Sequence, residues 1–388
     1  MNIKTTLKSS VAAAALFAIA APVAPSVNAA DDTLKSGNKN SLTVSGQVVR
    51  TLFYADDGLD EASFQSDGGI TSSRVRWVAK GTVNENMTMG ATMELNAPLS
   101  NPQASLLLNN GTSPGASTDT ATQTAWGVRH QFIWVKHKRM GKVSLGQTNS
   151  ASNGRSETTF SGVNMAADSG GTTFGTGNRF IDTTAGTQSI SATTVGAVFT
   201  NFDGRSRTDV LRYDSPRFNG LALAVSAIAG GDWDVGADYR VKTGAIKIRI
   251  QAQHNNNGAT SATVGGSTSF SAAALHDSGL NAAFAYGRRE LDGNASANVD
   301  DPTMWDFDIG YRAKIFGIGP TNFSFNRQTT DDLSGNDTEA VSTGFTIAQI
   351  ISPVGASMAL GYKNYAFDTA TNTFDDIDVI SLQTVFKF

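Results

Sequence analysis

The sequence contains no cysteine and carries little charge for its 388 residues. The absence of cysteine excludes disulfides, thiolate metal sites and cysteine nucleophiles together. Charged residues make up 16% of the chain, against about 25% in an average soluble domain. A long apolar run is missing as well, so the sequence predicts no transmembrane helix. These absences are compatible with a protein that spans the membrane as a β-barrel, because the closed hydrogen-bond ladder of a barrel needs no disulfide.

The N-terminus has the order of a secretory signal peptide. Lys4 and Lys8 precede the longest apolar run, residues 11–21, which is too short to span a membrane as a helix. Small residues then offer a cleavage site at Val27-Asn28-Ala29. A buried N-terminal helix is the alternative interpretation of the same run.

We therefore expect residues 1–29 to be a cleaved signal peptide and residues 30–388 to form one domain. Removal of two lysines takes the formal charge from −4 to −6. A mildly acidic exported protein has no electrostatic basis for binding nucleic acid.

From Ser41 onward, segments of about ten residues alternate in polarity between turn residues. The clearest pair sets apolar residues (Trp233, Val235, Ala237, Tyr239, Val241, then Ile246, Ile248, Ile250, Ala252) opposite polar ones (Asp234, Asp238, Arg240, Lys242, then Lys247, Arg249, Gln251, Gln253). Residues 242–244 are expected to connect these two strands. Alternation with a period of two is the pattern of a strand with unlike faces.

Three earlier segments place charged residues on the polar face. The first sets Val75, Trp77 and Ala79 opposite Arg74, Arg76 and Lys80. The second sets Met87, Met89, Ala91, Met93 and Leu95 opposite Thr88, Thr92, Glu94 and Asn96. The third sets Trp126, Val128, Phe132 and Trp134 opposite Arg129 and Gln131.

Short connections alternate with long polar ones along the whole chain. This rhythm predicts an all-β fold, a 16-stranded antiparallel transmembrane β-barrel with short periplasmic turns and long external loops. A soluble antiparallel sandwich also shows alternation, but it does not favour aromatic residues at strand ends. The aromatic residues near expected strand ends are Tyr54, Trp77, Trp126, Trp134, Trp233, Trp305, Tyr362 and Phe388.

The last strand ends the chain on an aromatic residue. Ile380, Leu382, Phe386 and Phe388 share one face, opposite Ser381, Gln383 and Lys387. This ending resembles the C-terminal signature of Gram-negative outer-membrane barrels.

Several ordered motifs extend the resemblance to most of the mature chain. They include Val44-Ser45-Gly46-Gln47, Ser73-Arg74-Val75-Arg76, Gly141-Lys142-Val143-Ser144-Leu145-Gly146-Gln147, Leu211-Arg212-Tyr213-Asp214-Ser215-Pro216 and Gly310-Tyr311-Arg312-Ala313-Lys314. In their order and spacing the sequence resembles Gram-negative general diffusion porins, in the pattern of the alphaproteobacterial trimeric porins.

The resemblance implies a trimer of sixteen-stranded barrels, each with its third external loop folded into the lumen. It also implies a constriction where acids on that loop face basic residues on the wall. Residues 148–193 correspond to the loop, and the implied constriction residues are Arg74, Arg76, Arg129 and Arg212 on the wall and Glu157, Asp168 and Asp182 on the loop. Each of them has an alternative interpretation as a solvated wall or loop residue.

The four histidines are the residues on which a hydrolase would depend. We expect His130 and His254 on outward faces, His137 at a strand end and His276 in a turn. None has a serine and an acid at strand spacing, so the sequence does not predict an enzyme. It predicts no cofactor and no metal either, because clustered loop acids such as Asp331-Asp332 are usually only solvated.

The resemblance implies an outer-membrane porin for passive diffusion of small hydrophilic solutes and ions, in contact with outer-membrane lipid. A substrate-specific channel and a structural or adhesive barrel remain alternatives. The first would predict aromatic residues along the lumen, and the second would show no conductance.

Overall fold

The computed structural model describes most of the mature chain. The described residues are 34–35, 40–68, 71–97, 106–108, 118–119, 126–162, 175–258, 261, 263–292 and 299–388. The expected signal peptide, residues 1–29, and the loop acid Asp168 lie outside these ranges. Within them, no helix has the length and apolarity needed to cross a membrane.

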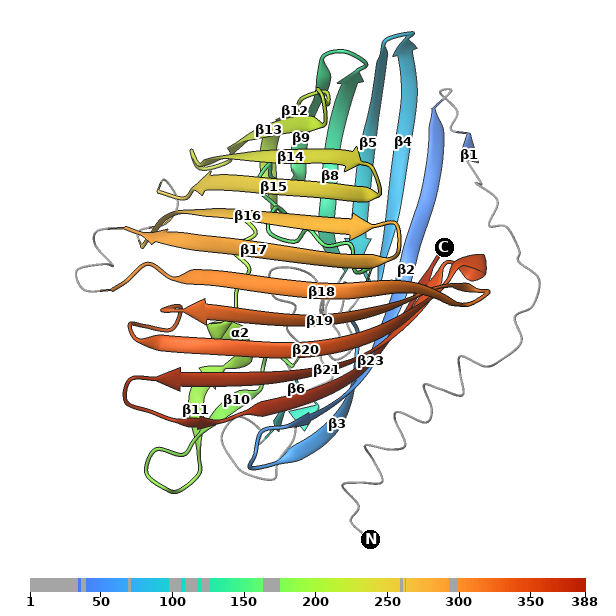
Figure 1. The fold of residues 1–388 in the computed structure, drawn as a ribbon. Helices are drawn as coiled ribbons and strands as arrows, with labels where there is room; N and C mark the ends of the chain where they lie inside the picture. The colour runs from blue at the N-terminus through green and yellow to red at the C-terminus, as the bar shows by residue number, and fades with distance from the viewer. Residues whose placement is uncertain are drawn as a thin grey trace.

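Sixteen antiparallel strands form a closed barrel, as the alternation predicts (Figure 1). They are β2 (Ser41–Asp56), β4 (Arg74–Asn84), β5 (Met87–Asn96), β8 (Gly127–His137), β9 (Gly141–Asn149), β12 (Arg207–Asp214), β13 (Leu221–Ile228), β14 (Trp233–Thr243), β15 (Ile246–Asn256), β16 (Val264–His276), β17 (Leu280–Leu291), β18 (Thr303–Phe316), β19 (Gly319–Asp331), β20 (Thr338–Ile351), β21 (Ala356–Thr369) and β23 (Ile377–Lys387).

The first and last long strands close the barrel. β2 pairs with β23 from Gln47 opposite Lys387 to Asp56 opposite Asp378. The terminal residue extends this pairing, because the Gly46 N–H donates to the Phe388 carbonyl at 2.8 Å. β1 (Leu34–Lys35) and β3 (Glu61–Ser66) pair with the two ends of β2, which brings the sheet to 18 strands.

The connections on the periplasmic side are tight. Gly244 and Ala245 alone connect β14 to β15, because the ladder continues through Lys242 opposite Lys247. The connection is therefore two residues long and begins later than the expected 242–244. Gly244 has a φ of 54°, as the first position of a two-residue hairpin loop requires. The connection from β20 to β21 contains the short 3₁₀ helix η3 (Ser352–Val354).

The two faces of the wall differ as lipid and water require. Large apolar side chains, among them Leu223, Ile250 and Phe307, are exposed on the outer face. The residues between them, such as Ser226, Gln251 and Asp308, are buried on the lumen side. An apolar outside with a polar inside is the arrangement of a transmembrane barrel.

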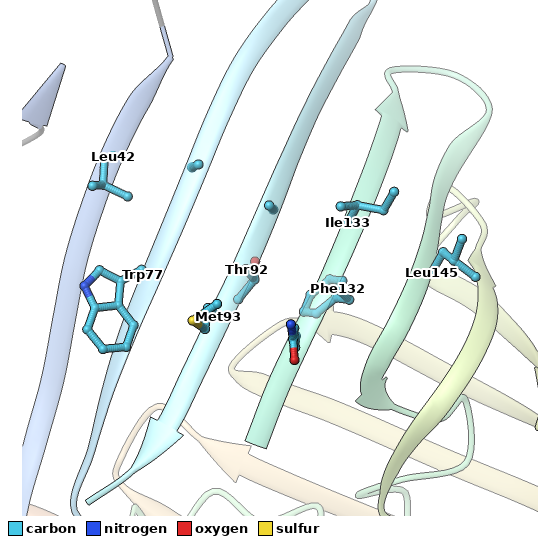
Figure 2. Close-up of a pocket in the computed structure, with 10 residues that line it drawn as sticks. Leu42, Trp77, Thr92, Met93, Phe132, Ile133 and Leu145 are labelled. Atoms are coloured by element: carbon cyan, nitrogen blue, oxygen red, sulfur yellow. The ribbon is translucent and has the colours of Figure 1, made fainter. Parts of the chain in front are cut away.

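In β8 the expected faces are wrong beyond Arg129. A β-bulge lies where Glu94 and Leu95 of β5 pair with His130 and Val128. The extra residue reverses the phase, so Ile133 faces outward and Phe132 faces the lumen. Figure 2 shows Ile133 in front of its strand and Phe132 behind it.

The reversal also moves two other residues expected on the outer face. Trp134 lies against the lumen-facing Gly90, and a Cβ added to Gly90 would be 2.5 Å from the Trp134 ring. His130 is buried on the lumen side, with Nδ1 at 3.2 Å from the Thr148 hydroxyl. Trp134 therefore does not belong to an interfacial aromatic belt.

The third external loop folds into the barrel, as the resemblance implies. It runs over residues 150–206, longer than the expected 148–193, because β9 continues to Asn149 and β12 begins only at Arg207. The loop contains β10 (Arg179–Asp182), β11 (Ser189–Thr194) and the short helix α2 (Val195–Val198). Two further short strands, β6 (Leu106–Leu107) and β7 (Thr118–Asp119), pair with each other and form a separate small sheet.

An apolar core holds this loop against one side of the lumen. We call the lumen faces of β2, β20, β21 and β23 the covered wall. Phe180 and Phe199 of the loop are buried against residues of this wall, and the Phe199 ring packs tilted against that of Tyr365 at a centroid distance of 5.3 Å. Figure 1 shows β10, β11 and α2 beside β20 and β21. β22 (Phe374–Asp375) pairs with β10 above this core.

Candidate functional site

Three of the arginines expected in the constriction converge on one carboxylate. Glu94 on β5 is 1% exposed and forms an ion pair with Arg76 Nε. Arg129 Nε lies 2.8 Å from its other carboxylate oxygen, and Arg74 Nη1 lies 3.8 Å away. We call these four residues the Glu94 cluster. Three guanidinium groups share one carboxylate, so the cluster has an excess of positive charge.

Register and the bulge together build this cluster. Arg76 stands directly opposite Glu94 in the β4–β5 ladder, so their side chains meet on the lumen face. Arg129 occupies the bulged position of β8, and from there it reaches the same carboxylate. Without the extra residue, the alternation of β8 would have placed Arg129 and His130 on opposite faces.

The cationic end of the cluster faces open space. The side chain of Arg76 is 46% exposed, although Arg76 lies on the lumen face of the wall. An exposed guanidinium inside a barrel faces the water of the lumen. This part of the lumen is therefore open, in contrast to the covered wall.

The internal loop brings acids toward the same region. Glu157 is exposed and accepts a hydrogen bond from Asn201 Nδ2 at 2.9 Å. Its carboxyl group is also hydrogen bonded to Asp203. Burial raises the pKa of Asp203, an effect that the hydrogen bond to Glu157 partly opposes.

Arg207, the first residue of β12, lies electrostatically between the Glu94 cluster and the loop acids. It interacts with Glu94 and Arg129 on the wall, and also with Asp203 and Glu157 on the loop. A chain of charges thus runs from the wall to the loop through this residue.

Two residues expected in the constriction make contacts outside the Glu94 cluster. Arg212 forms an ion pair with Asp214 at 2.6 Å on its own strand, and it donates to the carbonyls of Asn149 and Ser150. Asp182 lies on β10 at the loop surface and accepts from Asn372 Nδ2 at 2.9 Å. Asp168 lies outside the described residues.

Hydrogen bonds fix the loop where it enters the lumen. Ala151 N donates to Asp234 at 3.1 Å, and the Ser152 hydroxyl donates to the same carboxylate at 2.6 Å. Farther along, Asn322 Nδ2 donates to the Gly162 carbonyl. The loop therefore has polar anchors on β14 and β19 in addition to its apolar core.

Some residues of the site carried no decisive signal in the sequence. Glu94 was expected on a lumen face, but nothing in the sequence indicated that three arginines would meet there. Asp203 and Arg207 lie near a loop end that was placed too early. A longer expected loop would have included Asp203.

The sequence matches one family model over most of its length. Residues 10–384 match the model described as Gram-negative porin. The chain belongs to the Gram-negative porin family. A search of curated proteins found no significant match.

Solved porins and outer-membrane channels share the fold of this porin. The anion-selective porin from Comamonas acidovorans aligns with a TM-score of 0.59 at 12% identity, covering 90% of this chain and 100% of that one. Outer-membrane expressed OmpT of Vibrio cholerae aligns at 0.56 and 14% identity, covering 92% and 100%. The outer-membrane channel DcaP of Acinetobacter baumannii aligns at 0.56 and 12% identity, covering 92% and 99%.

Family and fold together define the general function. The protein is an outer-membrane porin, and its barrel forms a channel for passive diffusion of small hydrophilic solutes and ions. These findings indicate a channel rather than an enzyme.

Proposed function

We propose that this porin is a general diffusion channel with a preference for small anions, and that the Glu94 cluster forms the basic side of its constriction. The observation that supports this proposal is the convergence of Arg74, Arg76 and Arg129 on one buried carboxylate. Their excess positive charge lies beside open lumen, although the whole chain has a formal charge of −4.

The opposite side of the constriction belongs to the loop. Glu157 is exposed toward the lumen and Asp203 lies beside it. Acids facing arginines create a transverse field that orients water and disfavours apolar solutes, which would have to displace that water. Solutes then pass down their gradient, and the balance of fixed charge sets the selectivity. Because Arg212 and Asp182 make other contacts, we leave them out of the proposed constriction.

The preference for anions has a second support. The structure with a TM-score of 0.59 is named an anion-selective porin, and its alignment covers 90% of this chain. At 12% identity the likeness extends to the fold only. The proposal therefore depends on the charges of this chain. The neighbour's name indicates only that a barrel of this fold can select anions.

The test neutralises the two arginines that contact Glu94 most directly. In planar bilayers under a salt gradient, Arg76→Gln with Arg129→Gln should shift the reversal potential toward cations. Lys138→Gln with Arg139→Gln removes the same charge from the exposed turn between β8 and β9 and should leave the potential unchanged. An unchanged potential in the first variant would refute the assignment.

Conductance itself decides between the other functions. Steady, ungated current of open-pore size supports a diffusion channel. Saturation by one sugar or peptide would favour a substrate-specific channel, and absent current would favour a structural or adhesive barrel. We infer a channel and no catalytic role, because family and fold both indicate a porin.

We also propose a homotrimer and a cleaved leader. One neighbour is titled the trimer form of OmpT from Vibrio cholerae, and Arg50 points outward from β2 opposite Thr384, where a subunit contact would shield it from lipid. Light scattering of the detergent-solubilised protein tests the trimer. The mass of the mature protein tests removal of residues 1–29.

A further inference from the structure

A second arginine cluster lies on the lumen wall, apart from the Glu94 cluster. Asp238 on β14 is its centre, with Arg240 Nη2 at 2.7 Å and Arg249 Nη2 at 3.2 Å from the carboxylate. Arg217, from the turn before β13, lies at 3.4 Å, and Arg155 of the internal loop lies at 4.0 Å. We call these five residues the Asp238 cluster. Four guanidinium groups around one carboxylate leave an excess of three positive charges.

The loop places its arginine firmly into this cluster. Arg155 Nε donates to the Ala151 carbonyl at 3.1 Å, and the Ser271 hydroxyl donates to the Arg155 carbonyl at 2.7 Å. Gln251, with its amide nitrogen directed to Thr158, accepts from Arg155 Nη1 at 2.9 Å and from Arg249 Nη2 at 3.1 Å. The amide orientation follows from the hydrogen-bond network.

The position of the cluster along the channel follows from the ladder of β14. Asp234 anchors the loop, and Asp238, Arg240 and Lys242 come next on the same face toward the periplasmic turn. The cluster therefore lies on the periplasmic side of the loop, where a solute would arrive after the constriction.

The surrounding ladder repeats like charges instead of pairing opposite ones. Arg240 stands directly opposite Arg249, and Lys242 stands directly opposite Lys247. Like charges directly opposite each other destabilise a sheet. A wall built only for stability would set acids opposite these bases. Two successive like-charge pairs indicate that positive potential at this point has a use.

The donors of the cluster are directed at the lumen. The side chain of Arg240 is 53% exposed, that of Arg217 36% and that of Arg249 31%, whereas Asp238 is nearly buried. The planar fork of a guanidinium matches oxyanions in bidentate geometry. Three such forks from different elements border one space, which suits an anion with several oxygens and more than one charge.

We propose that the Asp238 cluster is a binding station for small divalent oxyanions of the phosphate and sulfate type on the periplasmic side of the loop. It holds such an ion briefly as it leaves the constriction and concentrates it over monovalent ions. The inference rests on the proposed diffusion channel, because a solute reaches the station only through the lumen.

Sulfate is the probe, since it stays divalent across the working pH range. Chloride current through the full mature protein in planar bilayers is measured while sulfate is added on the periplasmic side. We expect a saturable reduction of the chloride current by sulfate, and none by nitrate, a monovalent oxyanion. A linear response to sulfate, or an equal response to nitrate, would overturn the proposal.

Two variants change the affinity in opposite directions. Arg240→Gln with Arg249→Gln should raise the half-blocking sulfate concentration about tenfold or more, because charge-assisted hydrogen bonds to the ion are lost. Asp238→Asn should lower that concentration, because it removes the competing carboxylate and keeps all four donors. A purely structural cluster would weaken sulfate block in both variants.

The control removes the same charge from another part of the lumen face. Lys80 on β4 and Lys136 on β8 are exposed, away from the Asp238 cluster. Lys80→Gln with Lys136→Gln should keep the half-blocking concentration of the native protein. An equal loss of sulfate block in this variant would mean that a diffuse field, and not a station, attracts the ion.

The outcomes also separate this inference from the proposed function. If the native protein shows no current at all, the diffusion channel itself fails. If the current is normal but sulfate never saturates it, only the station fails. Folding of each variant is checked by its circular dichroism spectrum, and Asp238→Asn gives a gain of affinity that misfolding does not produce.

Discussion

Two sides of one lumen differ in almost every physical respect. The covered wall carries apolar and small polar residues, and it is sealed by the internal loop, so that Tyr365 and Ile377 are fully buried. Lys363 is charged, but it is also fully buried there beside Tyr365. The lumen faces of β4, β5, β8, β14 and β15, here called the basic wall, keep Arg76 and Arg240 exposed to the lumen.

The difference shows how one loop can divide a barrel. An apolar core attaches the loop to the covered wall, which leaves the passage to run along the basic wall. Burial of apolar surface supplies the attachment, and excess positive charge supplies the selectivity that we propose. The two functions are separated around the circumference, so each can be changed without the other.

The strongest way to break this comparison is to detach the loop. Phe180→Ala with Phe199→Ala removes two buried rings, and each such truncation costs about 3–5 kcal/mol in a packed core. We expect a larger and more variable single-channel conductance, because the loop no longer stays on the covered wall. Recordings of single channels in planar bilayers measure both changes.

A matched control lies on the same wall, facing the other way. Phe345 on β20 is exposed on the outer face, so Phe345→Ala removes a ring without touching the loop. Its conductance should equal that of the native protein. If the double variant also kept native conductance, the polar anchors at Asp234 and Asn322 alone would hold the loop, and the apolar core would have no part in it.

A second variant changes the basic wall while leaving the loop in place. Glu94→Gln removes the carboxylate that three arginines share, so the anion preference should increase. Removing one partner of a fully buried ion pair costs about 3–5 kcal/mol. The free energy of unfolding should fall by less than that here, because 46% of the Arg76 side chain is exposed. Reversal potentials and denaturant unfolding measure the two effects.

Its control is a carboxylate of the same type outside the lumen. Glu85 lies exposed in the turn between β4 and β5, and Glu85→Gln should alter neither quantity. A shift of the Glu94→Gln channel toward cations would contradict the role given to the Glu94 cluster.

The sequence predicted the regular part of the wall well, because its physics is local. β14 and β15 pair without interruption, so alternation alone placed Arg240 and Arg249 on the lumen face and Ile250 on the lipid face. In β8 one extra residue exchanged the faces of Phe132 and Ile133. A bulge leaves the composition of a strand unchanged, so the pattern of apolar residues did not reveal it.

The site was harder to predict than the fold, because it depends on register and on the course of a loop. Alternation placed Arg76 and Glu94 on lumen faces, but only the strand pairing shows that they meet. No periodicity describes residues 150–206, so the sequence placed the loop end too early and included Asp182 but not Asp203 among the loop acids. Asp203 lies beside Glu157, whereas Asp182 lies at the surface with Asn372.

These two aspartates give the smallest and most specific prediction, a pH dependence. Burial raises the pKa of Asp203, whereas hydrogen bonds from Thr184 lower the pKa of Asp182. As the pH falls, Asp203 therefore takes up a proton before Asp182 does. The lumen then loses a negative charge beside Arg207. The preference for anions should rise modestly on acidification.

Reversal potentials measured across a pH series in planar bilayers test this dependence. In the Asp203→Asn channel the rise should be weaker, because the carboxyl group whose pKa is raised by burial is absent. Asp182→Asn should respond to pH as the native protein does, since hydrogen bonds lower the pKa of that carboxyl group and it lies on the loop surface, hydrogen bonded to Asn372. An equal pH response in the Asp203→Asn and Asp182→Asn channels would show that the acids of the loop do not shape the field in which the arginines of the basic wall act.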